Sequence, residues 1–235
     1  TDVLLDNKGT LDKYVGDAIV AFYGAPIEIE NHELWACKTA IIMQDNLELL
    51  RQKWQSEGDR WPEIVHHMQN RIGINTGQMV TGNMGSASRM NYTMMGDTVN
   101  LAARLEASAK QYGIYIQIAD TTYQPVKDQI VIRDLDFVRV MGKTEPAQVY
   151  ELISETSQEP ELYKKILPAF HEALALYRNQ EWNNAIEAFK ASDELEDMFP
   201  GRKTNPSRIY IPRCEHYRDN SPGDDWDGAW TLTSK

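Results

Sequence analysis

The stretch LDKYVGDAIVAFYG, residues 11–24, decides the fold of the N-terminal part of this chain. Two β-prone segments, Thr10–Tyr14 and Ala18–Tyr23, flank a Gly-Asp pair, which tolerates the backbone angles of a tight turn. The stretch therefore predicts a β-hairpin. Lys13 and Asp17 put two charges into this hairpin, and charges in a buried strand need a partner or a function.

The composition is that of an acidic globular protein. The chain has 235 residues, of which 42% are hydrophobic and 25% charged, and its net charge is −11. A nucleic-acid-binding surface needs a basic stripe, so we expect no nucleic-acid partner. Cys37 and Cys214 lie too far apart for a metal-ligand spacing. They also suggest no disulfide framework, so we expect a cytosolic setting. No apolar run reaches the ~18 residues of a membrane span, so we expect no membrane contact from this chain.

Two long helices are predicted by apolar residues that recur every three or four positions. The first runs from a cap at Asn31 to about Trp54. The second begins with Asp97 as its N-cap, runs to about Tyr112 and ends at Gly113, a residue type that often terminates helices.

Shorter β-prone segments predict the remaining strands. Gln69–Thr76 and Gln78–Met84 predict a hairpin hinged at Gly77, while Gly82 and Gly85 predict a loop after it. Further strands are predicted at Ile114–Ile118, Ile130–Arg133, Phe137–Val140 and Gln148–Ile153. Because strands and helices alternate without a repeating βαβ rhythm, the expected fold class is α+β.

The composition changes after about residue 154, where we expect a domain boundary. Helical runs at Leu162–Arg178 and Trp182–Leu195 follow, and Ala185 and Phe189 keep the A-x3-F spacing of a tetratricopeptide-like (TPR-like) helix pair. One such repeat cannot stand alone, so it must pack on the preceding domain or on a third helix near Pro206–Tyr217. The expected domains are 1–154 and 155–235, the second ending in an extended tail.

A second informative stretch is YTMMGDTVNLAARLE, residues 92–106. Asn100 and Arg104 are four positions apart on the predicted helix and share one face. An arginine offers a planar, permanently charged fork that suits a phosphoryl group. The same pair would also fit a solvated helix face, so by itself it does not decide between these interpretations.

Three motifs occur in order along the chain: LDKYVGDAIVAFYG, RIGINTGQMVTGNMG and YTMMGDTVNLAARLE. Together they resemble the catalytic domain of class III nucleotide cyclases, and the helical segment with its DWDGAWTLTSK terminus resembles bacterial adenylate cyclases. The resemblance implies a ferredoxin-like nucleotide cyclase sheet with flanking helices. It also implies conversion of ATP into cyclic AMP and pyrophosphate for signal transduction, with the domain in the cytoplasm whether or not the larger protein is membrane-anchored.

The resemblance assigns the catalytic roles residue by residue. Asp17 matches the family's metal-binding aspartate, which implies two Mg²⁺ or Mn²⁺ ions per site. Asn100 and Arg104 match the residues that stabilise the transition state. Lys143, in VMGKTEP, matches the lysine that contacts the triphosphate.

The resemblance also implies how the base is chosen. Lys13 and Thr93 match the positions that contact the adenine ring. A lysine can only donate, and adenine N1 accepts, whereas the Thr93 hydroxyl can accept from the adenine amino group. Guanine presents the reverse pattern, so this pair favours ATP, with a guanylate cyclase as the alternative.

Two further properties follow from the resemblance. Family members form head-to-tail homodimers with active sites shared between the two chains. They also carry a second metal-binding aspartate in an N-terminal strand, in a motif like F-x-D-I-x-G-F-T, which this sequence lacks. We therefore expect an N-terminally truncated domain that is active only in the complete chain. If the aspartate is truly lost, the alternative is a regulatory nucleotide-binding domain, and a third interpretation is an interaction module built on the C-terminal helices.

Overall fold

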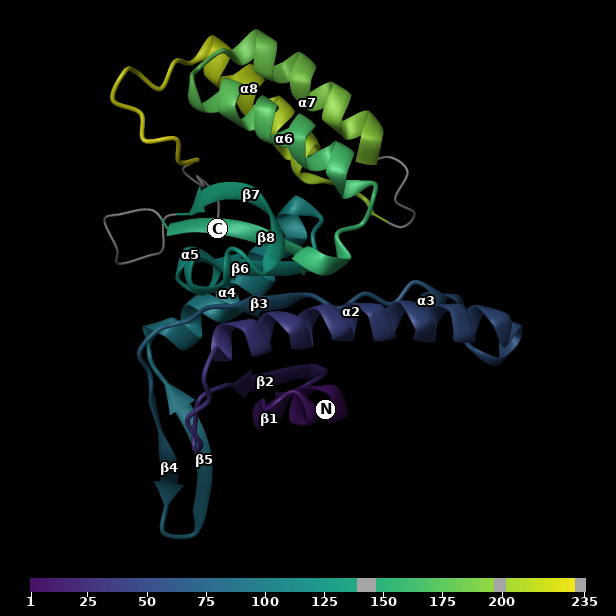
Figure 1. The fold of residues 1–235 in the computed structure, drawn as a ribbon, viewed down its shortest axis with the longest axis vertical. Coiled ribbons are helices and arrows are strands. Elements are labelled where there is room, and N and C mark those ends of the chain that lie inside the picture. Colours follow the sequence, from purple (N-terminus) through teal and green to yellow (C-terminus); the bar gives the residue numbers. More distant parts are fainter. Residues whose placement is uncertain (139–146, 197–201, 231–235) are drawn as a thin grey trace.

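A computed structural model describes residues 1–138, 147–196 and 202–230 (Figure 1). The first part of the chain contains α1 (Asp2–Asp6), β1 (Thr10–Val15), β2 (Ala18–Phe22), α2 (His32–Ser56), α3 (Glu63–His66), β3 (Ile72–Ile74), β4 (Val80–Ser86), β5 (Arg89–Met95), α4 (Asp97–Tyr112), β6 (Ile116–Ala119), α5 (Asp120–Tyr123), β7 (Ile130–Val138) and β8 (Ala147–Glu155). The second part contains α6 (Tyr163–Arg178), α7 (Trp182–Glu196) and α8 (Pro206–Asp219). This content confirms the expected α+β class.

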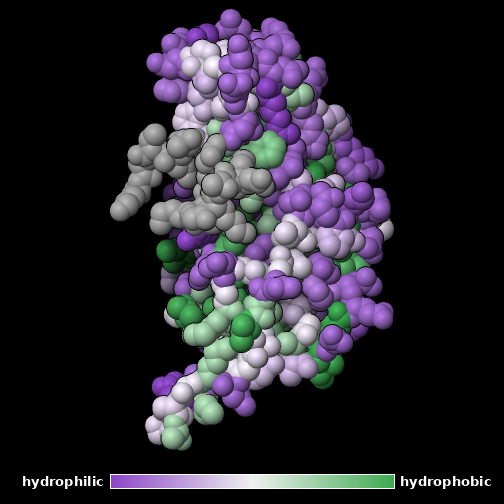
Figure 2. Space-filling model, turned by 90° about the vertical axis from the view of Figure 1, so that its left-hand side faces the viewer, coloured by the Kyte–Doolittle hydropathy of each residue, from purple (hydrophilic) through white to green (hydrophobic). Residues whose placement is uncertain are grey.

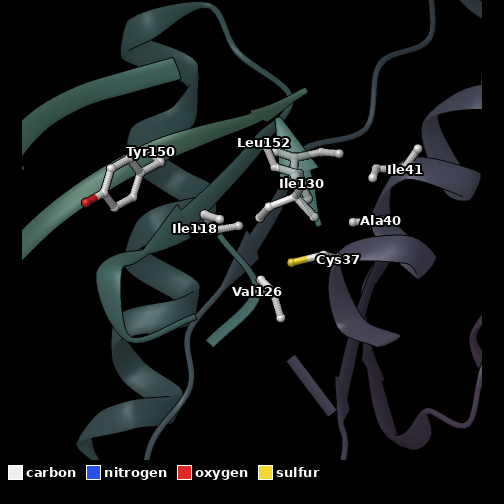
Figure 3. Close-up of a cluster of buried hydrophobic side chains, with 9 residues drawn as sticks. Cys37, Ala40, Ile41, Ile118, Val126, Ile130, Tyr150 and Leu152 are labelled. Carbon is white, nitrogen blue, oxygen red and sulfur yellow. The ribbon is translucent and has the colours of Figure 1, made fainter. Parts of the chain in front are cut away.

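A four-stranded sheet is the centre of the first part. Its strand order is β3-β6-β8-β7, with β3 parallel to β6 and the other pairs antiparallel. Helix α2 covers the sheet with Cys37, Ala40 and Ile41, which face Ile118 and Leu152 across a buried apolar cluster (Figure 3). The three-or-four spacing that predicted this helix is therefore the spacing of its buried face.

Helix α4 packs on the same sheet through a second cluster, which includes the buried Leu105 and Ala109. Gly73 of β3 makes the close approach possible, because a Cβ at this position would lie 2.2 Å from the Ala102 carbonyl oxygen. Gly113 ends the helix at φ +67°, as predicted. The buried face of α4 therefore fixes the helix on the sheet, and this determines where Asn100 and Arg104 lie on its other face.

The N-terminal ends of the two long helices differ in part from the predictions. Asn31 is the N-cap residue of α2 but makes no side-chain cap hydrogen bond. The prediction that Asp97 caps α4 is wrong, because Gly96 occupies that position and Asp97 is the first helical residue. A carboxylate in the first turn still interacts favourably with the helix dipole, which explains why an acidic residue fits there.

Two hairpins lie apart from the four-stranded sheet. Strands β1 and β2 form the predicted N-terminal hairpin, with Gly16 at φ +63° in its turn. Strands β4 and β5 form a second hairpin, which projects from the body as an arm (Figures 1 and 2). The hairpins meet where the rings of Phe22 and Tyr92 lie 6.0 Å apart between centroids.

The predicted pairing of Gln69–Thr76 with Gln78–Met84 is wrong. Strand β3 pairs with β6 instead, and the segment expected to be a loop after Gly82 forms the turn and second strand of the arm. Strand β3 is partly buried beneath α4 and pairs with β6 in the sheet, and the turn residues next to it in the sequence contain no information about that pairing. The separate strands predicted at 130–133 and 137–140 are one strand, β7, as far as residue 138, and residues 139–140 of that prediction lie outside the described residues. The irregular register of β7 hides its continuity in the sequence.

The last three helices form a compact unit against β7 and β8. Its apolar cluster includes Phe170, Tyr177, Phe189 and Tyr210, all almost fully buried. Trp226 of the tail packs on this cluster, with its ring centroid 5.1 Å from that of Tyr177. The predicted helix pair and third helix are present, while the TPR-like character of the pair remains a prediction.

Candidate functional site

A polar cluster forms where the two hairpins meet. Lys13 of β1 donates a hydrogen bond from Nζ to Thr93 Oγ1 of β5 across 3.1 Å. Thr93 in turn donates from Oγ1 to Asp12 Oδ2 at 2.8 Å, and Lys13 Nζ lies 3.5 Å from the same carboxylate oxygen. The structure therefore brings together the two residues that were matched to base contacts.

A β-bulge makes this cluster possible. Leu11 pairs with Ala21 and Lys13 with Val20, so Asp12 is an extra residue with no partner on β2. Side chains of consecutive strand residues normally point to opposite faces of a sheet. The bulge removes that alternation locally, and both Asp12 and Lys13 reach Thr93.

The three side chains differ strongly in exposure. The Lys13 side chain is 48% exposed and that of Asp12 is 2% exposed. Thr93 is also buried, and Asp12 Oδ1 has no hydrogen-bond partner in the part of the chain that the structure describes. The cluster thus presents an ammonium group to solvent above a buried hydroxyl and carboxylate.

The predicted phosphate-contacting pair lies on the exposed face of α4. Asn100 and Arg104 are both exposed, and neither side chain has a hydrogen-bond or ion-pair partner among the described residues. Both groups are therefore free to bind something that this chain alone does not supply. Lys143 lies outside the described residues.

Asp17 is exposed in the turn of the β1–β2 hairpin. Its carboxylate is a hard oxygen ligand of the kind that Mg²⁺ prefers, so the donor chemistry fits. No cluster of three or more His, Cys, Asp or Glu side chains in the described ranges could hold a metal ion. Asp17 can therefore contribute one ligand, and phosphate oxygens and further carboxylates would have to supply the others.

Asp12 is the member of the cluster that the sequence analysis missed. The only signal was the adjacency of an acidic and a basic residue in LDKY, which normal strand alternation would place on opposite faces. Recognising its role requires the bulge and the position of β5, both of which are tertiary features.

A Lys-Thr pair between two hairpins and an exposed Asn-Arg pair on an adjacent helix lie on one α+β domain. The family model for the adenylate and guanylate cyclase catalytic domain matches residues 2–154, and the chain belongs to this family. The match covers the whole α+β part and ends where the three-helix unit begins.

Named relatives support this assignment. The chain is 33% identical over 215 residues to the terminal-differentiation-specific adenylate cyclase of Dictyostelium discoideum, which covers 90% of this chain and 10% of that protein. It is 31% identical over 153 residues to adenylate cyclase 1 of Rhizobium meliloti, covering 65% of this chain and 22% of that protein. The chain therefore spans only a small part of these curated relatives. The Dictyostelium match must extend well into the three-helix unit, because it is longer than the family match.

Two crystal structures share the fold. The adenylyl cyclase CyaB from P. aeruginosa has a TM-score of 0.56 at 32% identity, covering 68% of this chain and 77% of that one. A guanylyl cyclase has a TM-score of 0.55 at 30% identity, covering 68% and 76%. These neighbours confirm the nucleotide cyclase fold. No helix in the described part of the chain is long and apolar enough to cross a membrane.

Proposed function

We propose that this domain makes cyclic AMP and pyrophosphate from ATP, as part of a cytoplasmic signalling reaction. The observation that carries the proposal is the contact between Lys13 and Thr93, 80 residues apart in sequence. A nucleotide cyclase domain must choose between adenine and guanine, and these two side chains have the chemistry to do so. The named relatives with matching sequence are adenylate cyclases, which supports the same choice.

The choice of base follows from donors and acceptors. The Lys13 ammonium has three N–H donors, and only donors, so it suits the acceptor N1 of adenine. The Thr93 oxygen can accept from the adenine amino group. Guanine presents a carbonyl oxygen and a protonated N1 in these places, which would leave donor facing donor at Lys13.

The remaining residues suit the cyclisation step. Asp17 would hold magnesium or manganese, and two such ions supply activation of the ribose 3′-hydroxyl and support for the leaving pyrophosphate. Arg104 would stabilise charge developing at the α-phosphate, and Asn100 would orient the ribose. Lys143 would bind the triphosphate. Because Asp17 and the Asn100–Arg104 pair serve different sites in this scheme, we propose a head-to-tail homodimer with two shared sites.

The proposal includes a requirement for a second carboxylate. One aspartate is a poor holder of two divalent ions, because each needs several oxygen ligands. We therefore expect turnover to require at least one further carboxylate ligand beside Asp17.

The test is to exchange the base preference. In the protein made from the full open reading frame, Lys13→Glu combined with Thr93→Cys should lower kcat/KM for ATP relative to GTP by about 100-fold, since two base contacts are lost or reversed. Lys127→Glu is the matched control, because Lys127 is exposed and lies outside the cluster. An unchanged preference for ATP would contradict the assignment of the base contacts.

The fold neighbour that is a guanylyl cyclase favours GTP as the second candidate substrate. A parent enzyme that forms cyclic GMP faster than cyclic AMP would establish that alternative. Nucleotide binding without any cyclic product, in the protein made from the full open reading frame, would favour the regulatory-domain interpretation.

A further inference from the structure

Asp12 shares the polar cluster with the two base contacts, although no role in base selection follows from its type alone. Its side chain is almost fully buried, at 2% exposure, and lies behind Thr93 and Lys13. A buried carboxylate that accepts only one hydrogen bond from within the chain is costly to the fold, because its second oxygen, Oδ1, is left without a partner in the described ranges. Such a residue calls for a functional explanation.

We propose that Asp12 sets the nucleotide specificity of this domain by fixing the direction of the Thr93 hydroxyl proton; this inference rests on the proposed function. A threonine hydroxyl is one donor and up to two acceptors, and it rotates to suit its surroundings. With its proton on Asp12 Oδ2 at 2.8 Å, the Thr93 oxygen can only accept from other groups. Lys13 Nζ uses one acceptor position at 3.1 Å, and one remains.

The remaining acceptor position decides between the two bases. The adenine amino group is a donor and satisfies it. The guanine O6 is an acceptor, so it would meet an oxygen with no proton to give and a buried carboxylate behind it. Without Asp12, the hydroxyl could rotate and donate to O6, and Thr93 would accommodate either base. Asp12 is therefore a positioning residue, which acts on the base through Thr93.

Asp12 also holds Lys13 in place. The ammonium group lies 3.5 Å from Asp12 Oδ2, so the carboxylate attracts the lysine toward the same side of the hairpin as Thr93. This attraction helps to keep one ammonium proton directed at Thr93 and leaves another free for the base. One carboxylate oxygen thus orients both base contacts, and the β-bulge at Asp12 is the backbone feature that lets it do so.

The experiment compares variants at Asp12 in the protein made from the full open reading frame. Asp12→Leu and Asp12→Ala remove the acceptor, and they differ in size on either side of aspartate, so an effect common to both does not arise from a change in volume. Asp12→Asn is the matched control, because its amide oxygen can still accept from Thr93. The readout is the ratio of kcat/KM for ATP to that for GTP, in which the concentration of active enzyme cancels. The dissociation constants of the two nucleotides give the same ratio without turnover.

The expected result is a fall in the ATP-to-GTP ratio of about tenfold or more for Asp12→Leu and Asp12→Ala, with Asp12→Asn within about threefold of the parent protein. In a Thr93→Val background, Asp12→Leu should lower the ratio clearly less than it does in the parent protein, because there is no hydroxyl proton to direct and only the attraction on Lys13 is lost. A purely structural role would lower the values for both nucleotides equally.

Three results would overturn the proposal. The first is an unchanged ATP-to-GTP ratio in both Asp12→Leu and Asp12→Ala. The second is a fall in Asp12→Asn as large as in those two variants. The third is a fall for Asp12→Leu in the Thr93→Val background as large as in the parent protein. Failure of the proposed function itself looks different, because the parent protein would then bind nucleotide without forming cyclic AMP. The ratio of dissociation constants still tests Asp12 in that case.

Discussion

The interface between the sheet and the three-helix unit and the candidate site are both rich in charge, but their charges are arranged differently. At the interface, Arg133 of β7 is fully buried and is paired with Glu151 and Glu196. Arg213 of α8 is bonded at 2.6 Å to Asp136 of β7. At the candidate site, by contrast, the side chains of Asp17, Asn100 and Arg104 are exposed and have no partner among the described residues.

The surface of the molecule reflects this contrast. One face shows mainly hydrophilic residues over the helical unit and a concentration of apolar residues over the lower half, above the β4–β5 arm (Figure 2). Exposed apolar side chains on the two hairpins include Ile19, Val80, Met90 and Met95. Apolar surface beside unpartnered polar groups is typical of a surface that binds another molecule.

The charges at the interface and those at the candidate site differ in where their partners come from. Burial raises the pKa of Glu196, and Arg133 opposes that shift from within the same chain. The buried charges of the interface are thus paired with one another. Buried ion pairs therefore join the three-helix unit to the sheet. The site groups have the opposite property, and the proposed function assigns them a nucleotide, a metal ion and a second chain as partners.

The largest expected effect comes from breaking the interface. Arg133→Ala leaves two buried carboxylates with Arg202 as their remaining cation, and should lower the free energy of unfolding by about 3–5 kcal/mol. Lys190→Ala, which removes an exposed pair with Glu187, should change it by less than about 0.5 kcal/mol. Urea unfolding of the three proteins measures both values. Equal stability of Arg133→Ala and the parent would refute the view that this network holds the unit in place.

The next effect concerns activity alone. Asp17→Ala and Arg104→Ala should each reduce cyclic AMP formation by at least about 100-fold in the protein made from the full open reading frame, because each removes a charge that acts on the phosphates. Thermal unfolding should be nearly unchanged, since both side chains are exposed. Loss of activity accompanied by a large loss of stability would mean that these residues act structurally, like those of the interface.

The smallest effect is a pH dependence at the interface. His171 accepts a hydrogen bond from the Asp134 N–H at 3.1 Å, and burial lowers its pKa below the ordinary value of 6.5. Below pH 6.5 the imidazole is protonated in the unfolded chain but not in the folded one. The free energy of unfolding should therefore decrease as the pH is lowered from 6.5, until the lowered pKa of the folded state is reached. His171→Gln keeps an acceptor without titrating, and should show a shallower fall in urea titrations between pH 7 and 5.

The sequence predicted the parts of the fold that depend on local periodicity. The apolar spacing of α2 and α4 and the turn at Gly16 are local signals, and the structure confirms the elements they predicted. The pairing of β3 with β6 depends on burial beneath α4, and no short stretch of sequence contains that information.

The candidate site divides in the same way. The family resemblance matched both Lys13 and Thr93 to positions that contact the base, and the structure brings the two together in a direct hydrogen bond that was not predicted. The part played by Asp12 could not be predicted, because it depends on a bulge that breaks strand alternation. The charged interface with the three-helix unit was also missed, since its members come from distant segments.

The measurement that tests this account most directly is a mixing experiment. Asp17→Ala and Arg104→Ala proteins, each nearly inactive, are combined at several ratios, and cyclic AMP formation from ATP with magnesium is followed. If the exposed groups belong to sites shared between two chains, a mixed dimer has one intact site, and activity should rise to roughly a quarter of the parent value at equal amounts. No recovery at any ratio, with dimers shown to exchange subunits, would contradict the account.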